Sequence, residues 1–315
     1  MVLVTGGTGY LGRMLVARLL ARGERVRVFC RRPADIPAEL RLGDIERPED
    51  VRAAVRGARL VYHLAALVDH TAPEEMLRRI NVTGTANVVR AARGEGVRRL
   101  VHCSTVSAEP GGGSTAYGRS KIAAETVLRR EGAGLDWVIL RPGPVYDGER
   151  PNLRAAVRFA RRFRLVPRPL PDTRVHLASR GNVTRAFLLA AERGLPGKAY
   201  AVCDREAVPR ALLVRILCER AGAASVPLPL PLVQPLLWVA ALGFEAAAAA
   251  FGGRPRLSRR MVRMFLRRRC YDIRPAREDL GYDPLPTAEE FSRAVASCLA
   301  SIAQEPPGEN HTSYG

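Results

Sequence analysis

The sequence predicts an α/β protein with a doubly wound parallel sheet and a smaller, mostly helical C-terminal lobe. Short apolar runs alternate with segments of helical periodicity through the first half of the 315 residues. A glycine-rich segment directly follows the first apolar run, and prolines cluster after Arg141. Strands separated by helices form βαβ units, whose strands run parallel and whose ligands bind at the carboxyl ends of the strands.

The strands expected in the first half are short and rich in apolar and β-branched residues. They are Val2–Thr5, Arg25–Cys30, Leu60–Leu64, Leu100–Cys103 and Trp137–Leu140. Apolar residues recur at helical spacing in the segments between them. We therefore expect helices at Tyr10–Arg22, near Glu74–Arg93 and at Ala116–Arg130.

The second half predicts a separate lobe. Helices near Asn182–Arg193 and Ala207–Ala221 bracket an expected strand at Ala199–Val202. The final segment is rich in proline, glycine and polar residues, a composition typical of disordered termini. The expected divisions are a dinucleotide-binding domain at 1–150, a substrate-binding lobe at 151–303 that interleaves with it, and a disordered tail at 304–315.

The net charge of +19 is of the kind that attracts nucleic acids or anionic membranes. However, only two of the 50 basic residues are lysines, Lys121 and Lys198, which is typical of a GC-rich coding bias. The arginines are spread along the chain without the interleaved aromatic residues that stack on bases. We therefore expect no nucleic-acid partner, and we treat each retained lysine as informative.

The six cysteines lie far apart, and no two have Cys-x-x-Cys spacing. With five scattered histidines, they predict neither a metal site nor a disulfide framework. A reducing compartment fits this pattern, and the first residues read directly into a strand rather than into an apolar leader. We expect a cytoplasmic protein, with a homodimer left open.

One strongly apolar segment, Val226–Gly252, is followed by eight arginines between positions 254 and 269. Its uninterrupted core, Leu236–Phe244, is shorter than the roughly 20 residues that a membrane span requires. We favour a helix packed within the lobe. The alternative is peripheral contact of 226–269 with the inner face of the membrane, the arginines meeting anionic head groups.

The glycine-rich segment predicts a Rossmann-type dinucleotide site. Gly6, Gly9 and Gly12 recur every three residues between the first strand and the first helix, which opens with Tyr10 and Leu11. These glycines permit a tight turn, close approach of the backbone to a pyrophosphate, and close helix–strand packing. The helix N-terminus then directs free N–H groups toward the phosphates. We assign all five residues to cofactor binding.

The end of the second strand predicts the cofactor. An acidic residue at this place favours NAD, whereas arginine accommodates the 2′-phosphate of NADP. Here Cys30 is followed by Arg31 and Arg32, and the first acid is Asp35. We therefore expect NADP(H), with NAD(H) as the alternative.

A catalytic pair is predicted at Tyr117 and Lys121, which lie one turn apart at the start of an expected helix. A nearby ammonium stabilises the phenolate and lowers the pKa of a tyrosine, as acid–base catalysis near neutral pH requires. Ser104 and Thr105 follow the strand that ends at Cys103, so their hydroxyls are candidates to bind a substrate oxygen.

These motifs resemble those of the extended short-chain dehydrogenases/reductases of the NAD(P)-dependent epimerase/dehydratase superfamily. The resemblance also includes Gly43-Asp44-Ile45, His63-Leu64-Ala65-Ala66, Asn81-Val82-Thr83-Gly84-Thr85 and Arg141-Pro142-Gly143, in the order of that family. Within it, the chain is most similar to the bacterial 3-beta-hydroxysteroid dehydrogenase/isomerase-like branch, which also includes reductases of long-chain 2-alkyl-3-oxo acids.

The resemblance implies a role for each matching residue. Tyr117 would donate or accept the proton, Lys121 would lower its pKa and hold the nicotinamide ribose, and Thr105, in preference to Ser104, would supply the hydroxyl. Asp44 would bind the adenine amino group, and Asn81 would support the site. Cofactor contacts are implied for Asp44, Ile45, Ala65, Ala66, Asn81 and Pro142.

The expected function is that of an NADP(H)-dependent oxidoreductase. It would interconvert a secondary alcohol and a ketone on a small apolar substrate, either steroid-like or a long-chain 3-oxo or 3-hydroxy compound. One alternative is a nucleotide-sugar epimerase or dehydratase that retains bound NAD. A second is a non-catalytic NADP(H)-binding scaffold or sensor, because one fold hosts many functions.

Overall fold

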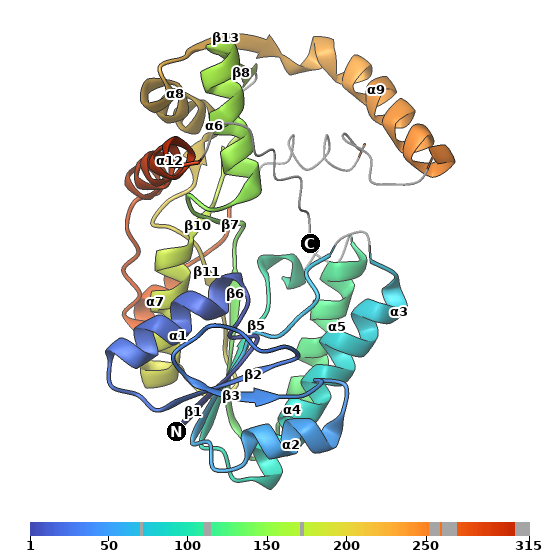
Figure 1. Cartoon of the computed structure of the whole chain (residues 1–315), viewed down its shortest axis with the longest axis vertical. Coiled ribbons are helices and arrows are strands. Elements are labelled where there is room, and N and C mark those ends of the chain that lie inside the picture. The colour runs from blue at the N-terminus through green and yellow to red at the C-terminus, as the bar shows by residue number, and fades with distance from the viewer. Residues whose placement is uncertain (70–71, 110–114, 171–172, 252–258, 260–269, 306–315) are drawn as a thin grey trace. The chain divides into compact units, whose positions relative to one another are not determined.

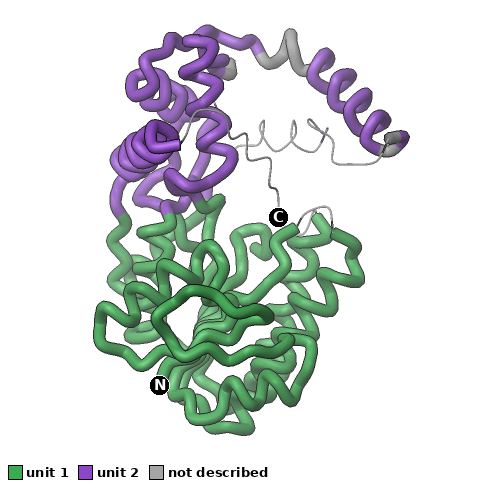
Figure 2. Tube along the Cα trace, in the orientation of Figure 1, with its two compact units in different colours: residues 1–145, 180–203, 271–284 green, residues 146–179, 204–270, 285–315 purple. Residues whose placement is uncertain are grey.

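The computed structural model describes residues 1–69, 72–109, 115–170, 173–251, 259 and 270–305. The chain forms two compact units, each assembled from segments that are separate in the sequence (Figure 2). Unit 1 comprises 1–145, 180–203 and 271–284, and unit 2 comprises 146–179, 204–270 and 285–315.

Unit 1 is built on a seven-stranded parallel sheet with the strand order β11-β6-β5-β4-β1-β2-β3 (Figure 1). The chain reverses its direction across the sheet between β1 and β4, which makes the sheet doubly wound. The strands are β1 (Val2–Thr5), β2 (Val26–Cys30), β3 (Glu39–Leu42), β4 (Leu60–His63), β5 (Arg99–Cys103), β6 (Asp136–Pro142) and β11 (Ala199–Val202). The predicted fold class is confirmed.

Helices cover this sheet in two groups. α1, α7 and α11 form one group, in which α7 contacts both others, and α4 contacts both α2 and α5 in the second group (Figure 1). The main core of the unit joins sheet residues such as Leu3 and Leu100 to Val88 of α4 and Leu128 of α5. The helices are α1 (Tyr10–Ala21), α2 (Pro48–Val55), α3 (Glu74–Leu77), α4 (Gly84–Gly94), α5 (Ala116–Glu131), α7 (Arg180–Arg193) and α11 (Arg274–Leu280).

Two local departures from the predicted elements bear on the site. The segment expected as one helix near Glu74–Arg93 consists of α3, a π-helix at Arg78–Thr83 and α4. A short 3₁₀ helix, Val106–Ala108, follows β5. π-Helical turns inside α-helices are frequent at functional sites, because the extra residue redirects side chains.

Unit 2 is mostly helical, and α6, α8 and α12 enclose a core that includes Val157, Leu217 and Val295. Strands β8 and β13 pair in parallel, and β9 pairs antiparallel with β12. Two further short strands are β7 (Val145–Tyr146), at the boundary of the units, and β10 (Ala178–Ser179). The remaining elements are α6 (Pro151–Phe163), β8 (Leu165–Leu170), β9 (Arg174–Val175), β12 (Val208–Pro209), α8 (Arg210–Ala221), β13 (Ala224–Pro229), α9 (Leu230–Phe251) and α12 (Thr287–Ala303).

Two sequence predictions fall partly beyond the described chain. In the predicted tail at 304–315, residues 306–315 lie outside the described residues, and α12 ends at Ala303. In the apolar and arginine-rich segment 226–269, residues 252–258 and 260–269 lie outside them. No helix within the described ranges is long and apolar enough to cross a membrane.

Candidate active site

The loop between β1 and α1 is closely packed at two glycines. Gly6 has a φ of +70°, and a Cβ there would lie 2.6 Å from the backbone nitrogen of Ala65. A Cβ on the buried Gly12 would collide with the carbonyl oxygen of Gly6 and lie 2.7 Å from the Cα of Gly7. Only glycine fits either position without moving backbone, so the loop presents backbone where a ligand could approach.

The start of α1 fits an anionic group. Gly9 precedes the helix in an extended conformation, and the first turn holds no acidic side chain. The free N–H groups of such a turn carry partial positive charge, which favours a phosphate. Tyr10 and Leu11 are partly buried, and the guanidinium of Arg180 lies 4.5 Å from the centre of the Tyr10 ring. The cradle therefore fits the diphosphate of a dinucleotide.

Arg31 and Arg32 lie at the same edge of the sheet as the glycine loop. β2 pairs in parallel with β1, with Phe29 opposite Thr5, so the residues after Cys30 follow the strand end beside that loop. Both arginine side chains are exposed. At this place a guanidinium could bind the 2′-phosphate of NADP through charge-assisted hydrogen bonds.

The other implied cofactor residues lie along the same edge. Asp44 is partly buried, and its Oδ1 accepts a hydrogen bond from the backbone N–H of Glu46 at 2.9 Å. Ile45 is a core residue that packs against Gly84, so only its backbone is available to a ligand. Ala65 and Ala66 follow β4 and are partly buried, and the buried Pro142 ends β6.

A buried chain of hydrogen bonds runs from Ala65, beside the glycine loop, to α4 and the π-helix. The backbone N–H of Ala65 donates to Thr5 Oγ1 (3.3 Å), which lies 2.7 Å from His63 Nδ1. His63 Nε2 lies 3.0 Å from Thr85 Oγ1, which donates to the carbonyl oxygen of Asn81 at 2.6 Å. Because the proton of Thr85 is committed to Asn81, His63 must donate through Nε2 and accept from Thr5 through Nδ1. All the donors in this chain therefore point from Ala65 toward Asn81.

This arrangement requires a neutral His63 and predicts a pH-dependent stability. Burial, with a smaller effect of the Lys121 charge, lowers the pKa of His63 from 6.5 to about 3. The unfolded chain then binds more protons between these values, so the free energy of unfolding is fully present above about pH 6.5 and falls as the pH drops. His63 accounts for about 2 kcal/mol of the fall in the free energy of unfolding between about pH 6.5 and about pH 5. We expect His63→Gln to abolish this part of the fall.

The measurement is urea unfolding of the wild type and His63→Gln at several pH values, read as the difference between the two. The comparison is needed because the pKa of His102, whose ring centre lies 5.1 Å from that of His63, is lowered as well. His102 therefore contributes to the same pH dependence. Burial and the Lys121 charge also lower the pKa of His102. A difference that stays constant with pH would mean that the chain does not hold His63 neutral.

Asn81 joins this hydrogen-bond chain to the helix that carries Tyr117. Its side-chain amide exchanges two hydrogen bonds with the backbone of Leu67, at 2.7 and 3.1 Å, and donates a third to Ser120 Oγ at 2.9 Å. Ser120 in turn donates to the carbonyl oxygen of Tyr117 at 2.8 Å. Asn81 lies within the π-helix and is 1% exposed, so its hydrogen bond to Ser120 links the π-helix to the first turns of α5.

Tyr117 and Lys121 lie on the first turns of α5, where Thr115 caps the helix by accepting the N–H of Gly118 at 2.9 Å. Both side chains are buried, and Lys121 Nζ donates to the carbonyl oxygen of Cys103 at 2.7 Å. Burial, reinforced by Cys103, raises the pKa of Tyr117, whereas burial lowers the pKa of Lys121. This direction is opposite to the one that the Tyr117–Lys121 spacing predicts, because burial disfavours the charged phenolate.

The two neighbouring hydroxyls after β5 have different surroundings. Ser104 is 4% exposed, and its Oγ donates to Glu125 at 2.6 Å. The same carboxylate pairs with Arg129 and, through two hydrogen bonds, with Arg141. Thr105 is partly buried and accepts the N–H of Ser107 at 3.3 Å, which leaves its own proton to donate. The Ser104 hydroxyl is thus committed to Glu125, whereas the Thr105 hydroxyl keeps a proton that it can donate.

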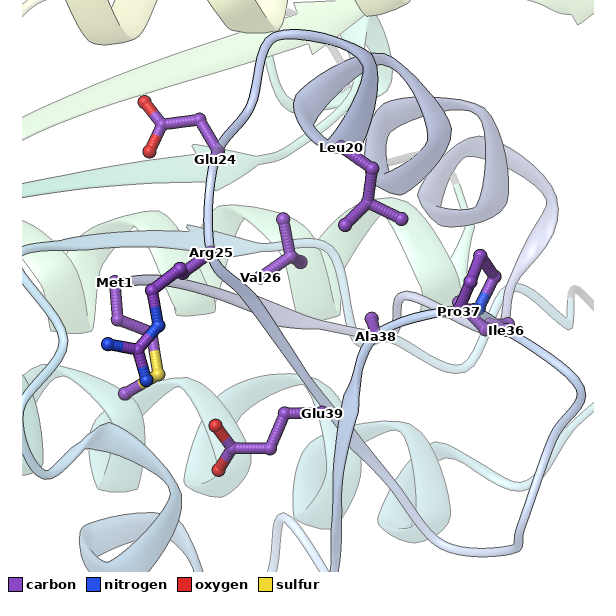
Figure 3. A pocket seen from close by; sticks show the side chains of 9 residues that line it. All are labelled: Met1, Leu20, Glu24, Arg25, Val26, Ile36, Pro37, Ala38 and Glu39. Atoms are coloured by element: carbon purple, nitrogen blue, oxygen red, sulfur yellow. The ribbon is translucent and has the colours of Figure 1, made fainter.

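A hollow of about 530 Å³ in unit 1 lies away from these residues (Figure 3). Met1 and Val26 line it, and they lie at the amino ends of β1 and β2, opposite the edge that carries the glycine loop. Ligands of doubly wound sheets bind at the carboxyl ends. This hollow is therefore not the candidate active site.

The chain is similar in sequence and in fold to known proteins. The family model described as "NAD dependent epimerase/dehydratase family" matches residues 2–193. A 3-beta-hydroxysteroid dehydrogenase of Mycolicibacterium neoaurum is 32% identical over 343 residues, covering 95% of this chain and 90% of the relative. Sterol demethylase protein B of Methylococcus capsulatus is 33% identical over 325 residues, covering 93% and 97%. A short-chain dehydrogenase/reductase superfamily protein of Agrobacterium tumefaciens with bound NAD has a TM-score of 0.74 at 21% identity, covering 96% and 98%.

Proposed function

The chain belongs to the NAD-dependent epimerase/dehydratase family and is an NAD(P)-dependent enzyme of the short-chain dehydrogenase/reductase type, and from this premise we propose its reaction. We propose that it uses NADP(H) to interconvert a ketone and a secondary alcohol on an apolar substrate, steroid-like or a long-chain 3-oxo compound. The observation that carries this proposal is the buried Tyr117, one helical turn from the buried Lys121 at the carboxyl edge of the sheet.

In the proposed reaction, Tyr117, Thr105 and Lys121 have different roles in proton donation to the ketone. The reduced nicotinamide, when bound, supplies the hydride for the carbonyl carbon. Tyr117 donates its phenolic proton to the carbonyl oxygen, and Thr105 donates a second hydrogen bond to that oxygen. The Lys121 ammonium, anchored on the carbonyl oxygen of Cys103, stabilises the phenolate that remains. Tyr117 is protonated at neutral pH, as any tyrosine with an ordinary or raised pKa is, so the phenol holds the proton that ketone reduction consumes.

An apolar substrate is supported by two relatives, whose names refer to a hydroxysteroid and to a sterol. A nucleotide-sugar epimerase that recycles bound NAD is less well supported, because Arg31 and Arg32 stand where NAD-binding folds place an acid. A non-catalytic scaffold need not keep Tyr117, Lys121 and Thr105 together at one sheet edge. The deciding test is whether reduced cofactor is consumed in proportion to a ketone of this class.

A further inference from the structure

Exposed apolar side chains concentrate in unit 2. Of the thirteen large apolar side chains that are exposed among the described residues, eight belong to this unit. Four are on α9: Leu236 and Val239 are 70% exposed, Leu242 is 51% and Phe244 is 41% exposed. A cluster of this kind on a folded protein marks an interaction surface more often than an accident of composition.

The charge of α9 is neutralised at its only ionisable residue. Glu245 is the sole charged side chain between Leu230 and Phe251, and its Oε2 lies 2.7 Å from Arg259 Nε. The backbone N–H of Arg259 donates to the other carboxylate oxygen at 2.9 Å. The helix therefore presents an apolar surface with its one carboxylate paired.

The sequence after α9 is strongly basic. It carries eight arginines between positions 254 and 269 and no acid until Asp272. α9 has 22 residues, or about 33 Å of helix, and it includes Pro235. A long apolar helix that is followed in the sequence by clustered arginines is typical of a segment that lies in the membrane interface.

We propose that α9 docks onto a membrane surface rich in anionic lipid. The exposed residues Leu236, Val239, Leu242 and Phe244 enter the boundary between head groups and acyl chains, and the eight arginines that follow in the sequence supply the positive charge that favours anionic lipid. A second copy of the chain is the less favourable occupant. A two-fold contact through α9 would bring together two chains that each carry a net charge of +19, and like charges would repel.

The test is sedimentation of the full chain with vesicles of phosphatidylcholine alone or of phosphatidylcholine and phosphatidylglycerol in equal parts. We expect binding to the anionic vesicles at least about tenfold tighter than to the neutral ones, weakening as salt screens the arginines. The double variant Leu236→Ser/Val239→Ser should bind at least about tenfold more weakly, because two apolar side chains no longer insert. Leu195→Ser, at a 43% exposed leucine of unit 1, is the matched control and should bind as the wild type does.

Reversal of Arg267, Arg268 and Arg269 to glutamate is an independent variant, expected to weaken binding by about a hundredfold. Thermal unfolding confirms that each variant is folded. The proposal is overturned if the wild type stays in the supernatant with both vesicles, or if Leu236→Ser/Val239→Ser binds as tightly as Leu195→Ser. A concentration-dependent dimer in light scattering that this double variant dissociates, without vesicle binding by the wild type, would assign the surface to a second copy instead.

Discussion

Replacing Tyr117 by phenylalanine is expected to lower kcat/KM for ketone reduction by about 10² to 10⁴, the usual contribution of a positioned general acid. Only the phenolic oxygen is removed, and the ring still fills its buried place at the start of α5. The affinity for reduced cofactor should therefore change little. The measurement is steady-state reduction of the best ketone substrate, with cofactor binding followed by nicotinamide fluorescence.

Two controls separate proton donation by Tyr117 from a loss of structure. Lys121→Arg keeps the charge, but a guanidinium does not reproduce the compact contact with the carbonyl oxygen of Cys103, so kcat should fall in this variant also. Because burial raises the pKa of Tyr117, the wild-type rate of reduction should stay flat through neutral pH and fall only in alkali, as the acid form is lost. Near-normal turnover by Tyr117→Phe would refute the assignment.

The cofactor preference is the second large effect. We expect kcat/KM for NADPH to exceed that for NADH by at least about tenfold, because hydrogen bonds to a charged group contribute about 1.5–3 kcal/mol. Arg31 follows the end of β2, where the 2′-phosphate should lie. Arg31→Asp should invert the preference, because a carboxylate repels the phosphate and accepts hydrogen bonds from the ribose hydroxyls.

Arg98→Asp is the matched control for this charge change. Arg98 is also exposed, but it precedes β5 at the amino edge of the sheet, so its replacement should leave the NADPH:NADH ratio unchanged. Equal use of both cofactors by the wild type, or an unchanged NADPH:NADH ratio in Arg31→Asp, would contradict this role of Arg31. Another group, such as Asp35 or a backbone atom, would then bind the ribose.

The fold was largely predictable because the inner strands of a parallel sheet are buried on both faces and read as apolar runs. β1 is buried at all four residues, and its predicted bounds agree with the structure. β3 was missed because this edge strand is mostly exposed and so lacks an apolar run. The π-helix at Arg78–Thr83 was also missed, since one extra residue per turn leaves helical periodicity almost unchanged.

The candidate site was predictable only as far as local spacing reaches. The glycine loop and the Tyr117–Lys121 pair are contiguous motifs, so their residues could be named from the sequence. The direction of the Tyr117 pKa shift depends on burial by distant segments, and no local pattern encodes it. The partners Thr5, His63 and Thr85 come from three separate elements, although His63 and Thr85 lay inside motifs that were already noted.

Two supporting residues also have a local signal in the sequence. Glu125 lies one turn beyond Lys121 on the same helix, and that spacing could have indicated its contact with the strand end at Ser104. Ser120, which links Asn81 to Tyr117, lies between the two proposed catalytic residues. Their roles are visible only once β5, β6 and α5 are brought together, as when Arg141 of β6 pairs with Glu125.

The most direct test of the proposed reaction is the consumption of reduced cofactor, followed by nicotinamide absorbance, across a panel of 3-keto steroids, long-chain 3-oxo acids and nucleotide sugars. This reaction predicts that NADPH is oxidised one for one with a ketone of the first two classes, yielding the secondary alcohol, and that Tyr117→Phe slows this consumption by about 10² to 10⁴. Conversion of a nucleotide sugar with no net change in cofactor, and no oxidation of NADPH by any apolar ketone, would contradict it.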